Sequence, residues 1–450
     1  MTTLVFAHPA LRELWGSIRD DELESAAVLL CVPVQLRSAG GWRLMVREMH
    51  VPTEANYEVR SPTRVQIKTE FCLRIEKRAR LNKWSLVYVH THPKQHTPEF
   101  SEIDDDTENG LSSYLQMRCP EVPHVSLLLG MHHLIAREIG SRIPVRVMEL
   151  GHDVQVAYDA TEPELLEERF DRQVRAFGPD GQARLSTLVV AIVGLGGTGS
   201  HVLQQLAHLG IQQFILVDPD SVEVTNLNRV VGATLADVGE PKTRYAERLI
   251  QGLGGKEPTV LRGDVTAEDV VRRVIEADII FNCTDTQSSR HVLNQAAYQY
   301  MVPVIDMGVS VTVDANMHAR FAGHVKMLSP GLPCLWCCNH LDPEALRREM
   351  MTAEQRQADP YVQGAATVVQ PAVISLNGVV ASAAVTMLLS AVAGVPAPTR
   401  YIHYDGNRAR MNGLKVQRDH ACAFCGDAST AGTGDAFPLP VRRRGEGSNH

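Results

Sequence analysis

A histidine pair and a following acid have the types and spacing of a metal site. His90-Thr91-His92-Pro93 comes directly after the apolar, strand-like run Leu86–Val89, and Ser101-Glu102-Ile103-Asp104 follows it. Residues two apart on a strand share a face, so both imidazoles can bind one metal ion, with Asp104 as a third ligand. Zinc with three protein ligands keeps a position for water, which a nearby carboxylate can deprotonate for hydrolysis. Ser101 and Asp104 also match a helix-capping box, and both roles can hold at once.

A glycine-rich turn indicates a nucleotide site. The apolar run Leu188–Val193 leads into Gly194-Leu195-Gly196-Gly197-Thr198-Gly199, which fits G-x-G-x-x-G at a strand-to-helix junction. Gly194, Gly196 and Gly199 permit a tight turn, an open approach to phosphate and close helix packing, and the helix amides hold the phosphate. Asp218 ends the next strand, where its carboxylate can accept hydrogen bonds from ribose hydroxyls.

Four polar residues downstream favour a triphosphate over a dinucleotide. Asn226 and Arg229 follow Asp218, Lys242 follows Gly-Glu-Pro, and Asp285 closes Asn-Cys-Thr-Asp at a strand end. Two cations and an amide would neutralise phosphates, and the carboxylate could carry magnesium, none of which a dehydrogenase needs. Alternatively, Arg229 and Lys242 are surface charges and Asp285 is a helix cap.

Two cysteine pairs predict a second metal site. Cys334-Leu335-Trp336-Cys337 and Cys422-Ala423-Phe424-Cys425 form two C-x-x-C knuckles, which together can give zinc four thiolate ligands. Such a site is structural because its coordination is full, and the alternative is four buried thiols. Nine cysteines are too few for a disulfide scaffold, so we expect a reduced, cytoplasmic protein.

Charge and hydropathy limit the partners. The chain has 44 basic and 52 acidic residues and a net charge of −8, which argues against a nucleic-acid partner. The segment Pro371–Val395 is almost free of charge and long enough to span a bilayer. Its polar interruptions, such as Asn377 and Ser382, favour a buried core helix instead, and we expect no membrane partner.

The elements that must position these residues divide the chain in two. Strand-like runs at 27–34, 42–46 and 125–129 come first; then strands at 187–193, 214–217, 279–281 and 304–305 alternate with helices at 199–209 and 242–250. This alternation predicts a parallel, doubly wound, Rossmann-like sheet with ligands at the carboxyl ends of its strands. We therefore predict an α/β protein with a metal-binding domain at 1–150, a linker at 151–164, an ATP-binding domain at 165–430 and a disordered tail at 431–450.

The second domain resembles the ThiF/MoeB type of adenylyltransferase in the ubiquitin-activating family. The resemblance begins at Arg169-Phe170-Asp171-Arg172-Gln173 and runs through the glycine turn to the second cysteine pair. It implies that Asp218 holds the ribose, that Asn226, Arg229 and Lys242 hold the phosphates, and that Asp285 holds Mg²⁺. It also implies a homodimer, in which Arg172 reaches the ATP site of the partner subunit. The substrate would be the C-terminal glycine carboxylate of a ubiquitin-like or sulfur-carrier protein.

The cysteine pattern departs from part of that family. Relatives that pass the activated protein to a thiol have a cysteine before the long core helix, whereas Met350–Gln370 has none. The spare thiols of this half are Cys283 and Cys338, and Cys338 is the weak candidate because a zinc neighbour could lower its pKa. We therefore expect adenylation alone, with transfer to a nucleophile on another protein such as a conjugating enzyme.

The first domain resembles the JAB/JAMM metalloproteases, which have an MPN-like fold and remove ubiquitin and its relatives. Over about residues 20–145 the resemblance implies that His90, His92 and Asp104 bind a catalytic zinc, Glu24 is the general base and Ser101 donates to the oxyanion. Glu22 is the alternative base. The loop between His92 and Ser101 is one residue longer than usual.

The two resemblances together predict a bifunctional enzyme of a ubiquitin-like pathway. One domain would process or deconjugate a ubiquitin-like protein, and the other would adenylate its C-terminus with ATP and Mg²⁺. The alternatives are sulfur-carrier activation for cofactor synthesis and a binding scaffold with degenerate sites.

Overall fold

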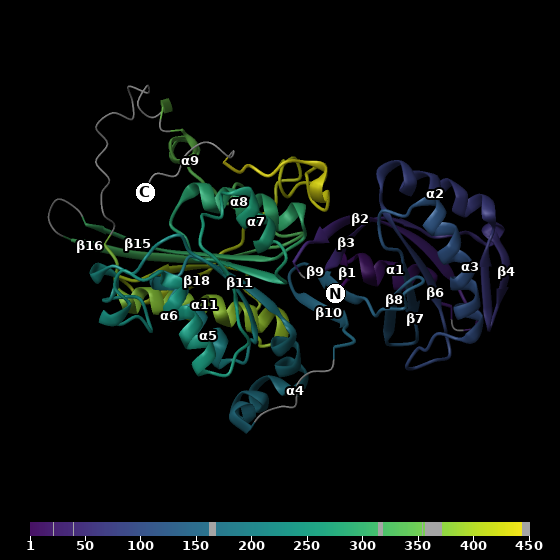
Figure 1. Ribbon diagram of the computed structural model, residues 1–450, viewed down its shortest axis with the longest axis horizontal. Coiled ribbons are helices and arrows are strands. Elements are labelled where there is room, and N and C mark those ends of the chain that lie inside the picture. Colours follow the sequence, from purple (N-terminus) through teal and green to yellow (C-terminus); the bar gives the residue numbers. More distant parts are fainter. Residues whose placement is uncertain are drawn as a thin grey trace. The chain divides into compact units, whose positions relative to one another are not determined.

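Two compact units make up the chain. The computed structural model describes residues 1–20, 22–38, 40–161, 168–313, 318–352, 354–355 and 371–442. Unit 1 is Met1–Glu162 with Gly432–Phe437, and unit 2 is Pro163–Ala431 with Pro438–His450. Each unit is built on its own eight-stranded sheet (Figure 1).

The sheet of unit 1 is mixed, in the order β10-β9-β1-β3-β2-β6-β7-β8. Its helices cover both faces, since Leu14 of α1 belongs to one buried cluster and Ile75 of α2 and Leu115 of α3 to the other. The strands are β1 (Thr3–Ala7), β2 (Ala26–Leu36), β3 (Gly41–His50), β6 (Ser85–Thr91), β7 (Val125–Leu129), β8 (Leu134–Glu138), β9 (Arg146–Leu150) and β10 (Val154–Tyr158). The other elements are α1 (Ala10–Ile18), α2 (Thr69–Asn82), α3 (Glu102–Arg118), η1 (Glu54–Asn56) and the hairpin β4 (Tyr57–Ser61) and β5 (Arg64–Ile67).

Two segments differ from what the sequence led us to expect. Residues 154–158 of the expected linker form strand β10, which pairs antiparallel with β9. Part of the expected disordered tail is ordered: η5 (Gly434–Ala436) belongs to unit 1, and Arg442 bonds through its amide to the Thr266 carbonyl of unit 2. Both segments bury few apolar side chains of their own, so composition gave no signal for them. Residues 443–450 lie outside the described residues.

Unit 2 has a sheet of two halves, in the order β13-β12-β11-β14-β15-β16-β17-β18. The first five strands are parallel, as the alternation of strands and helices predicted. From β15 onward every pairing is antiparallel, so the expectation of a wholly parallel sheet is wrong for this half. Antiparallel neighbours need no helical crossover, and β15 and β16 follow one another directly along the chain. The strands are β11 (Val189–Val193), β12 (Gln213–Val217), β13 (Thr259–Leu261), β14 (Ile279–Asn282), β15 (Val304–Val313), β16 (Ala319–Leu328), β17 (Tyr401–Asp405) and β18 (Arg410–Gly413).

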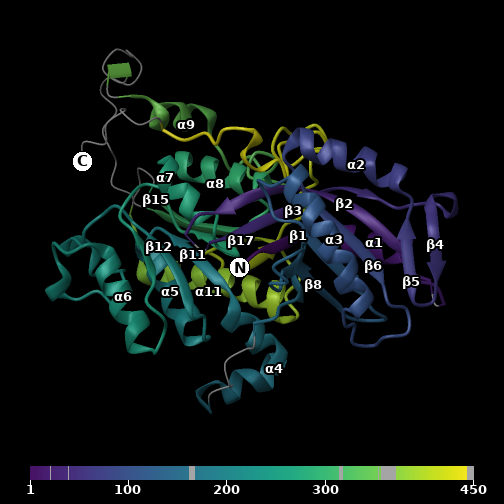
Figure 2. The same cartoon turned by 45° about the vertical axis from the view of Figure 1, so that its right-hand side comes forward.

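Helices lie on both faces of this sheet. In both views α5, α6 and α11 lie on one side, and α7 and α8 lie on the other (Figures 1 and 2). The helices are α4 (Asp171–Thr187), α5 (Gly197–His208), α6 (Lys242–Gly252), α7 (Glu268–Val274), α8 (Gln287–Gln299), α9 (Pro343–Met350) and α11 (Ile374–Ala393), with short turns η2 (Glu168–Phe170), η3 (Val224–Asn226) and η4 (Leu235–Asp237). Helix α4 has a kink at Gly178, where φ is +78° before Pro179.

Helix α11 is the apolar segment that raised the question of a membrane span. Among the described residues it is the one helix long and apolar enough for that, with a mean hydropathy of 1.8 over its best window. Of that window, 67% is buried inside the protein, which fits the predicted core helix. Its Val380 side chain packs close against Gly323 of β16, where a Cβ atom would lie 2.6 Å from it.

Candidate nucleotide and metal sites

The glycine turn joins β11 to α5 and leaves one side open. Gly194 has φ of +92°, a conformation that favours glycine. A Cβ at Gly199 would lie 1.8 Å from the Gly194 carbonyl oxygen, so close helix packing excludes any side chain there. A Cβ at Gly196, in contrast, would meet no atom within 4 Å. The turn therefore has the open backbone and the helix N-terminus that phosphate binding needs.

Asp218 lies directly beside this turn at the end of β12. Its Oδ2 accepts a hydrogen bond from the Leu195 amide at 2.6 Å, and its Oδ1 accepts one from the Asp220 amide at 2.9 Å. The residue is only 4% exposed, and burial raises the pKa of its carboxyl, while Lys242 and the two amides oppose the rise. Each oxygen keeps a second lone pair, so Asp218 fits a ribose hydroxyl as well as the turn.

Lys242 and Arg229, two of the three predicted phosphate ligands, lie near the same turn. The Lys242 Nζ atom, at the start of α6, lies 2.7 Å from Asp220 and 3.8 Å from Asp218. The Arg229 Cδ atom lies 3.5 Å from a Cβ built at Gly197. Asn226 is 7% exposed, and its Oδ1 accepts a bond from the Glu223 amide. The structure thus places two cations beside the helix N-terminus, which suits a polyphosphate.

The Cys283-Thr284-Asp285 segment also packs against the turn. A Cβ at Gly194 would lie 3.0 Å from the Cys283 carbonyl oxygen, and the Thr198 hydroxyl donates to that oxygen at 3.4 Å. Asp285 itself is exposed at the strand end. An exposed carboxylate next to bound phosphates is the kind of oxygen ligand that Mg²⁺ prefers.

Arg172 is not part of this cluster in the single chain. It is exposed in the first turn of α4, and no hydrogen bond or ion pair in the described structure joins it to the glycine turn. The implied role in the partner subunit's site stays a prediction.

Two neighbours of the turn were missed by the sequence reasoning. The Tyr245 hydroxyl, fully buried on α6, donates to the Leu195 carbonyl. The Asn377 amide on α11 lies against Gly197, with Nδ2 2.1 Å from where a Cβ would be. The sequence signal for Asn377 was an amide in a mostly apolar segment, but only the fold shows what it contacts.

The two cysteine knuckles come together. The Sγ atoms of Cys334 and Cys337 are 3.8 Å apart, those of Cys334 and Cys422 are 3.6 Å apart, and those of Cys337 and Cys425 are 3.5 Å apart. A tetrahedron with zinc–sulfur bonds of about 2.3 Å has sulfur–sulfur edges of about 3.8 Å. The four thiols therefore fit a zinc ion.

Aromatic rings attach the knuckles to α8. Trp336 and Phe424, one from each knuckle, are stacked with ring centroids 6.3 Å apart, and the edge of His291 on α8 meets both rings.

The two spare thiols of this unit, Cys283 and Cys338, are not activated. Burial raises the pKa of both thiols, although Lys326 opposes the rise at Cys338. Neither thiol has the lowered pKa of an activated nucleophile.

Comparison with known proteins agrees with the nucleotide site. The ThiF family model matches residues 170–424. The chain is 30% identical over 272 residues to the sulfur carrier protein adenylyltransferase of Thermus thermophilus, covering 58% of this chain and 92% of that protein. It is 29% identical over 270 residues to the sulfur carrier protein ThiS adenylyltransferase of Escherichia coli, covering 58% and 96%.

The chain belongs to the ThiF family. Its second unit is an ATP-dependent adenylyltransferase domain with a Rossmann-like, mixed sheet. Among solved structures, Escherichia coli MccB with ATP has a TM-score of 0.46 and 21% identity, covering 59% of this chain and 76% of that chain. The family match begins at residue 170, so the histidine site of unit 1 must be judged from its own geometry.

In unit 1 the predicted metal ligands lie together. His90 is the second-last residue of β6, His92 comes directly after the strand, and Asp104 comes from the first turn of α3. Asp104 Oδ1 is 3.1 Å from His90 Nε2, and Asp104 Oδ2 is 3.5 Å from His92 Nε2. His90 Nε2 is buried yet makes no aligned hydrogen bond, as expected of an atom aimed at an ion. The set fits a zinc ion with an open position.

Glu24, not Glu22, faces these histidines. Glu24 is 6% exposed, and its Oε1 is 3.6 Å from His92 Nε2, while Glu22 is exposed. Burial raises the pKa of Glu24 to about 7, with Asp104 adding to the rise and His90 opposing it. A carboxylate with that pKa can take a proton from water near neutral pH.

Ser101 and the loop before it have local roles in the structure. The Ser101 amide and hydroxyl both donate to Asp104 Oδ2, at 2.7 and 2.8 Å, so the predicted capping box forms around the same carboxylate. In the longer loop, Gln95 Oε1 contacts His92 Nδ1 at 3.1 Å and accepts from the Glu99 amide. Two further histidines of this unit, His132 and His133, are exposed and do not belong to the metal-ligand group. Gln95 can thus orient His92, a role that sequence gave no reason to assign.

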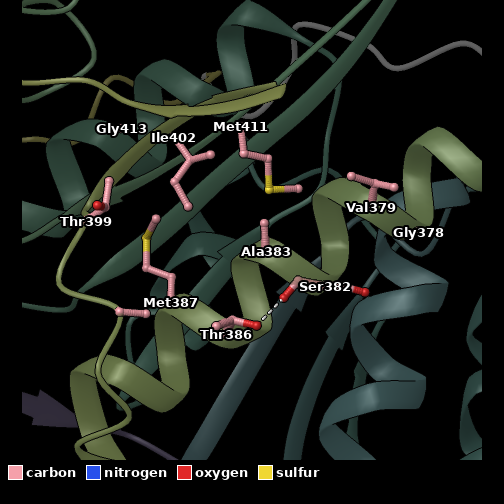
Figure 3. Close-up of a pocket in the computed structure, with 11 residues that line it drawn as sticks. Gly378, Val379, Ser382, Ala383, Thr386, Met387, Thr399, Ile402, Met411 and Gly413 are labelled. Carbon is pink, nitrogen blue, oxygen red and sulfur yellow. Dashed lines mark hydrogen bonds between the residues drawn. The ribbon is translucent and has the colours of Figure 1, made fainter. Parts of the chain in front are cut away.

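A separate apolar groove lies between α11 and the strands β17 and β18. It has a volume of about 670 Å³ and is lined by α11, β17, β18 and the segment before β17 (Figure 3). Its polar groups are the hydroxyls of Ser382, Thr386 and Thr399, and the Thr386 hydroxyl bonds to the Ser382 carbonyl. Its lining contains no charged residue, histidine or cysteine, so the groove is no candidate for the chemistry.

Proposed function

We propose that unit 2 adenylates the C-terminal glycine carboxylate of a small sulfur-carrier or ubiquitin-like protein. The observation that carries this proposal is the meeting of Asp218, Arg229, Lys242 and the Asp285 segment around one glycine turn. Sulfur-carrier activation is favoured over conjugation, because the two relatives named above are sulfur-carrier adenylyltransferases. The lack of a cysteine in Met350–Gln370 points the same way, although most of that stretch lies outside the described residues.

Catalysis of this reaction depends on neutralising the negative charge of the phosphates and needs no covalent bond to the protein. A carboxylate oxygen of the glycine bonds to the α-phosphorus of ATP, the bond to the bridging oxygen breaks, and pyrophosphate leaves. Arg229 and Lys242 would hold the phosphates, and Asp218 would hold the ribose. Bound Mg²⁺, held by Asp285, would neutralise phosphate charge. Arg172 of a second subunit would add a cation if the protein forms the expected homodimer.

ATP–pyrophosphate exchange tests this proposal. We expect exchange to depend on a carrier protein that ends in glycine and to fall at least about 100-fold in Asp285→Ala, because an unpaired phosphate charge is left at the reacting centre. Exchange that survives this substitution would overturn the magnesium assignment. Nucleotide binding without any exchange would favour a scaffold with degenerate sites.

The fate of the acyl-adenylate needs its own experiment. With a sulfide donor, the mass of the carrier protein should increase by the replacement of a C-terminal oxygen with sulfur. With a conjugating enzyme instead, a thioester on that enzyme would show protein conjugation. A covalent adduct on Cys338 of this chain would contradict transfer to another molecule.

We propose that unit 1 is a zinc-dependent peptidase or isopeptidase acting on the same class of protein. His90, His92 and Asp104 would hold the zinc, whose chemistry is to bind and activate a water molecule. Glu24 would take the proton from that water, and Ser101 would donate to the oxyanion. The support is the distance of 3.6 Å between Glu24 and His92 together with the ligand geometry.

Loss of cleavage in His92→Ala tests this second proposal. Cleavage of a C-terminal extension or of a conjugate should disappear in this variant, while pyrophosphate exchange stays normal because the two sites share no residue. Asp285→Ala should show the reverse. Cleavage that continues unchanged after zinc chelation would rule out the metallopeptidase.

A further inference from the structure

A buried carboxylate, Asp306, lies next to the strand that leads into the Cys283-Thr284-Asp285 segment, and no role has been assigned to it. Asp306 on β15 is 0% exposed, and its place in the sheet is directly beside Asn282, the last residue of β14. Its Oδ1 accepts a bond from Asn282 Nδ2 at 2.7 Å and lies 3.5 Å from Arg290 Nε, and its Oδ2 lies 2.9 Å from His324 Nε2. A buried charge is costly unless it is paired, so this arrangement needs a reason.

Two of these partners also hold Thr284, the residue before Asp285. Asn282 Oδ1 accepts from the Thr284 hydroxyl at 2.8 Å and from its amide at 3.3 Å. Arg290 Nη2 donates to the Thr284 carbonyl at 3.3 Å and to the Met307 carbonyl at 3.4 Å. The peptide groups on both sides of Thr284 are therefore fixed by side chains that both contact Asp306.

The electrostatics favour an ionised Asp306. Burial alone would raise the pKa of its carboxyl, but Arg290, His324 and Asn282 outweigh burial and hold that pKa below its usual value. The negative charge in turn keeps the Arg290 guanidinium in place. Arg290 Nε is buried without an aligned hydrogen bond, so the attraction to Asp306 at 3.5 Å is what holds that end of the guanidinium.

We propose that Asp306 is a positioning residue for adenylation, which fixes Asn282 and Arg290 so that the Thr284–Asp285 peptide presents the Asp285 carboxylate to Mg²⁺–ATP. This inference rests on the proposed function and on the magnesium role of Asp285. It concerns geometry: a carboxylate whose supporting hydrogen bonds are lost binds its ion more weakly, typically by about 10- to 100-fold.

The test is Asp306→Asn, which keeps the shape and removes the charge. We expect the Mg²⁺ concentration needed for half-maximal binding of a fluorescent ATP analogue to rise by about 10-fold or more. Pyrophosphate exchange should fall in parallel, and high Mg²⁺ should restore part of it. The binding measurement uses no carrier protein, so it separates Mg²⁺–ATP binding from turnover.

His340→Asn is the matched control. His340 is a half-buried neighbour of this group, with its ring centroid 4.4 Å from that of His324, but no hydrogen bond or ion pair in the described structure joins it to Thr284, Asn282 or Arg290. It should lower stability without changing the Mg²⁺ dependence. If Asp306→Asn fails to fold, Arg290→Lys keeps a positive charge, but its single nitrogen cannot both face Asp306 and bridge the two carbonyls, and it should show the same shift.

The outcomes are distinguishable. If Asp285→Ala abolishes exchange but neither Asp306→Asn nor Arg290→Lys alters the Mg²⁺ dependence, the positioning role is wrong and the proposed function stands. If His340→Asn shifts the Mg²⁺ dependence as much as Asp306→Asn, the effect is general softening of the fold, which also overturns the inference. If Asp285→Ala has no effect, the magnesium assignment fails first.

Discussion

Gly199 and Gly196 belong to one turn but carry different constraints. A side chain at Gly199 would collide with the Gly194 carbonyl, whereas one at Gly196 would point into open space. We expect Gly199→Ala to lower the free energy of unfolding by about 1 to 3 kcal/mol, because packed backbone must move. Gly196→Ala should leave stability unchanged but weaken ATP binding. Chemical denaturation and ATP titration of both variants check this, and equal stability losses would contradict it.

His340 predicts a dependence of stability on pH. Burial, aided by the charge of His324, lowers its pKa from 6.5 to about 4, while Asp306 opposes this shift; Lys326 and Arg290 also face it and add to the lowering. Between about pH 6.5 and 4 the unfolded chain binds a proton that the folded protein does not, so stability falls as pH falls through that window.

The substitution His340→Asn removes the group whose protonation lowers stability at acid pH. The variant should lose less stability than the parent between pH 7 and 4.5, by about 1 to 2 kcal/mol, allowing for partial exposure. Urea unfolding at four pH values within this range measures the difference. Parallel curves for the two proteins would show that His340 does not titrate in this way.

At the scale of elements, the two cysteine knuckles join parts of the chain that are far apart in sequence. The first knuckle contacts β16 through Lys326, and both knuckles contact α8 through His291. Cys337→Ala removes a ligand whose Sγ lies 3.5 Å from Cys425, so we expect it to lose the structural zinc. Cys338→Ala removes a thiol that contacts Lys326 instead, and it should keep the zinc. Metal analysis of purified variants checks this: one zinc fewer per chain for the first and an unchanged content for the second.

At the scale of the whole molecule, the C-terminal segment Gly432–Phe437 completes the fold of unit 1 although unit 2 precedes it in the chain. Gly434 has φ of +54°, and a Cβ there would lie 2.8 Å from Val34 and 3.1 Å from Val32. Gly434→Ala should therefore destabilise unit 1 by about 1 to 3 kcal/mol and leave unit 2 unchanged.

Hydrogen exchange can resolve this difference between units. Amides of β2 and β3 should exchange faster in Gly434→Ala, while amides of β11 and β12 should not. Ala436→Ser, at an exposed position of the same turn, is the control. Equal acceleration in both units would mean that the segment does not belong to unit 1 alone.

The sequence by itself determined the local chemistry of this protein. Strand, turn and helix around Gly194–Gly199 follow from a run of apolar residues and a glycine pattern, and the Ser101–Asp104 cap follows from two side chains three residues apart. These features depend on neighbours along the chain, which is why they could be predicted.

Only the tertiary structure decided which distant groups meet. The antiparallel half of the unit 2 sheet, the placement of Asn377 against Gly197 and the group around Asp306 all join residues far apart in sequence. Such contacts depend on sheet order and helix packing, and no local pattern encodes them. The same holds for Glu24, whose burial beside His92 raises its pKa although no neighbour along the chain is responsible.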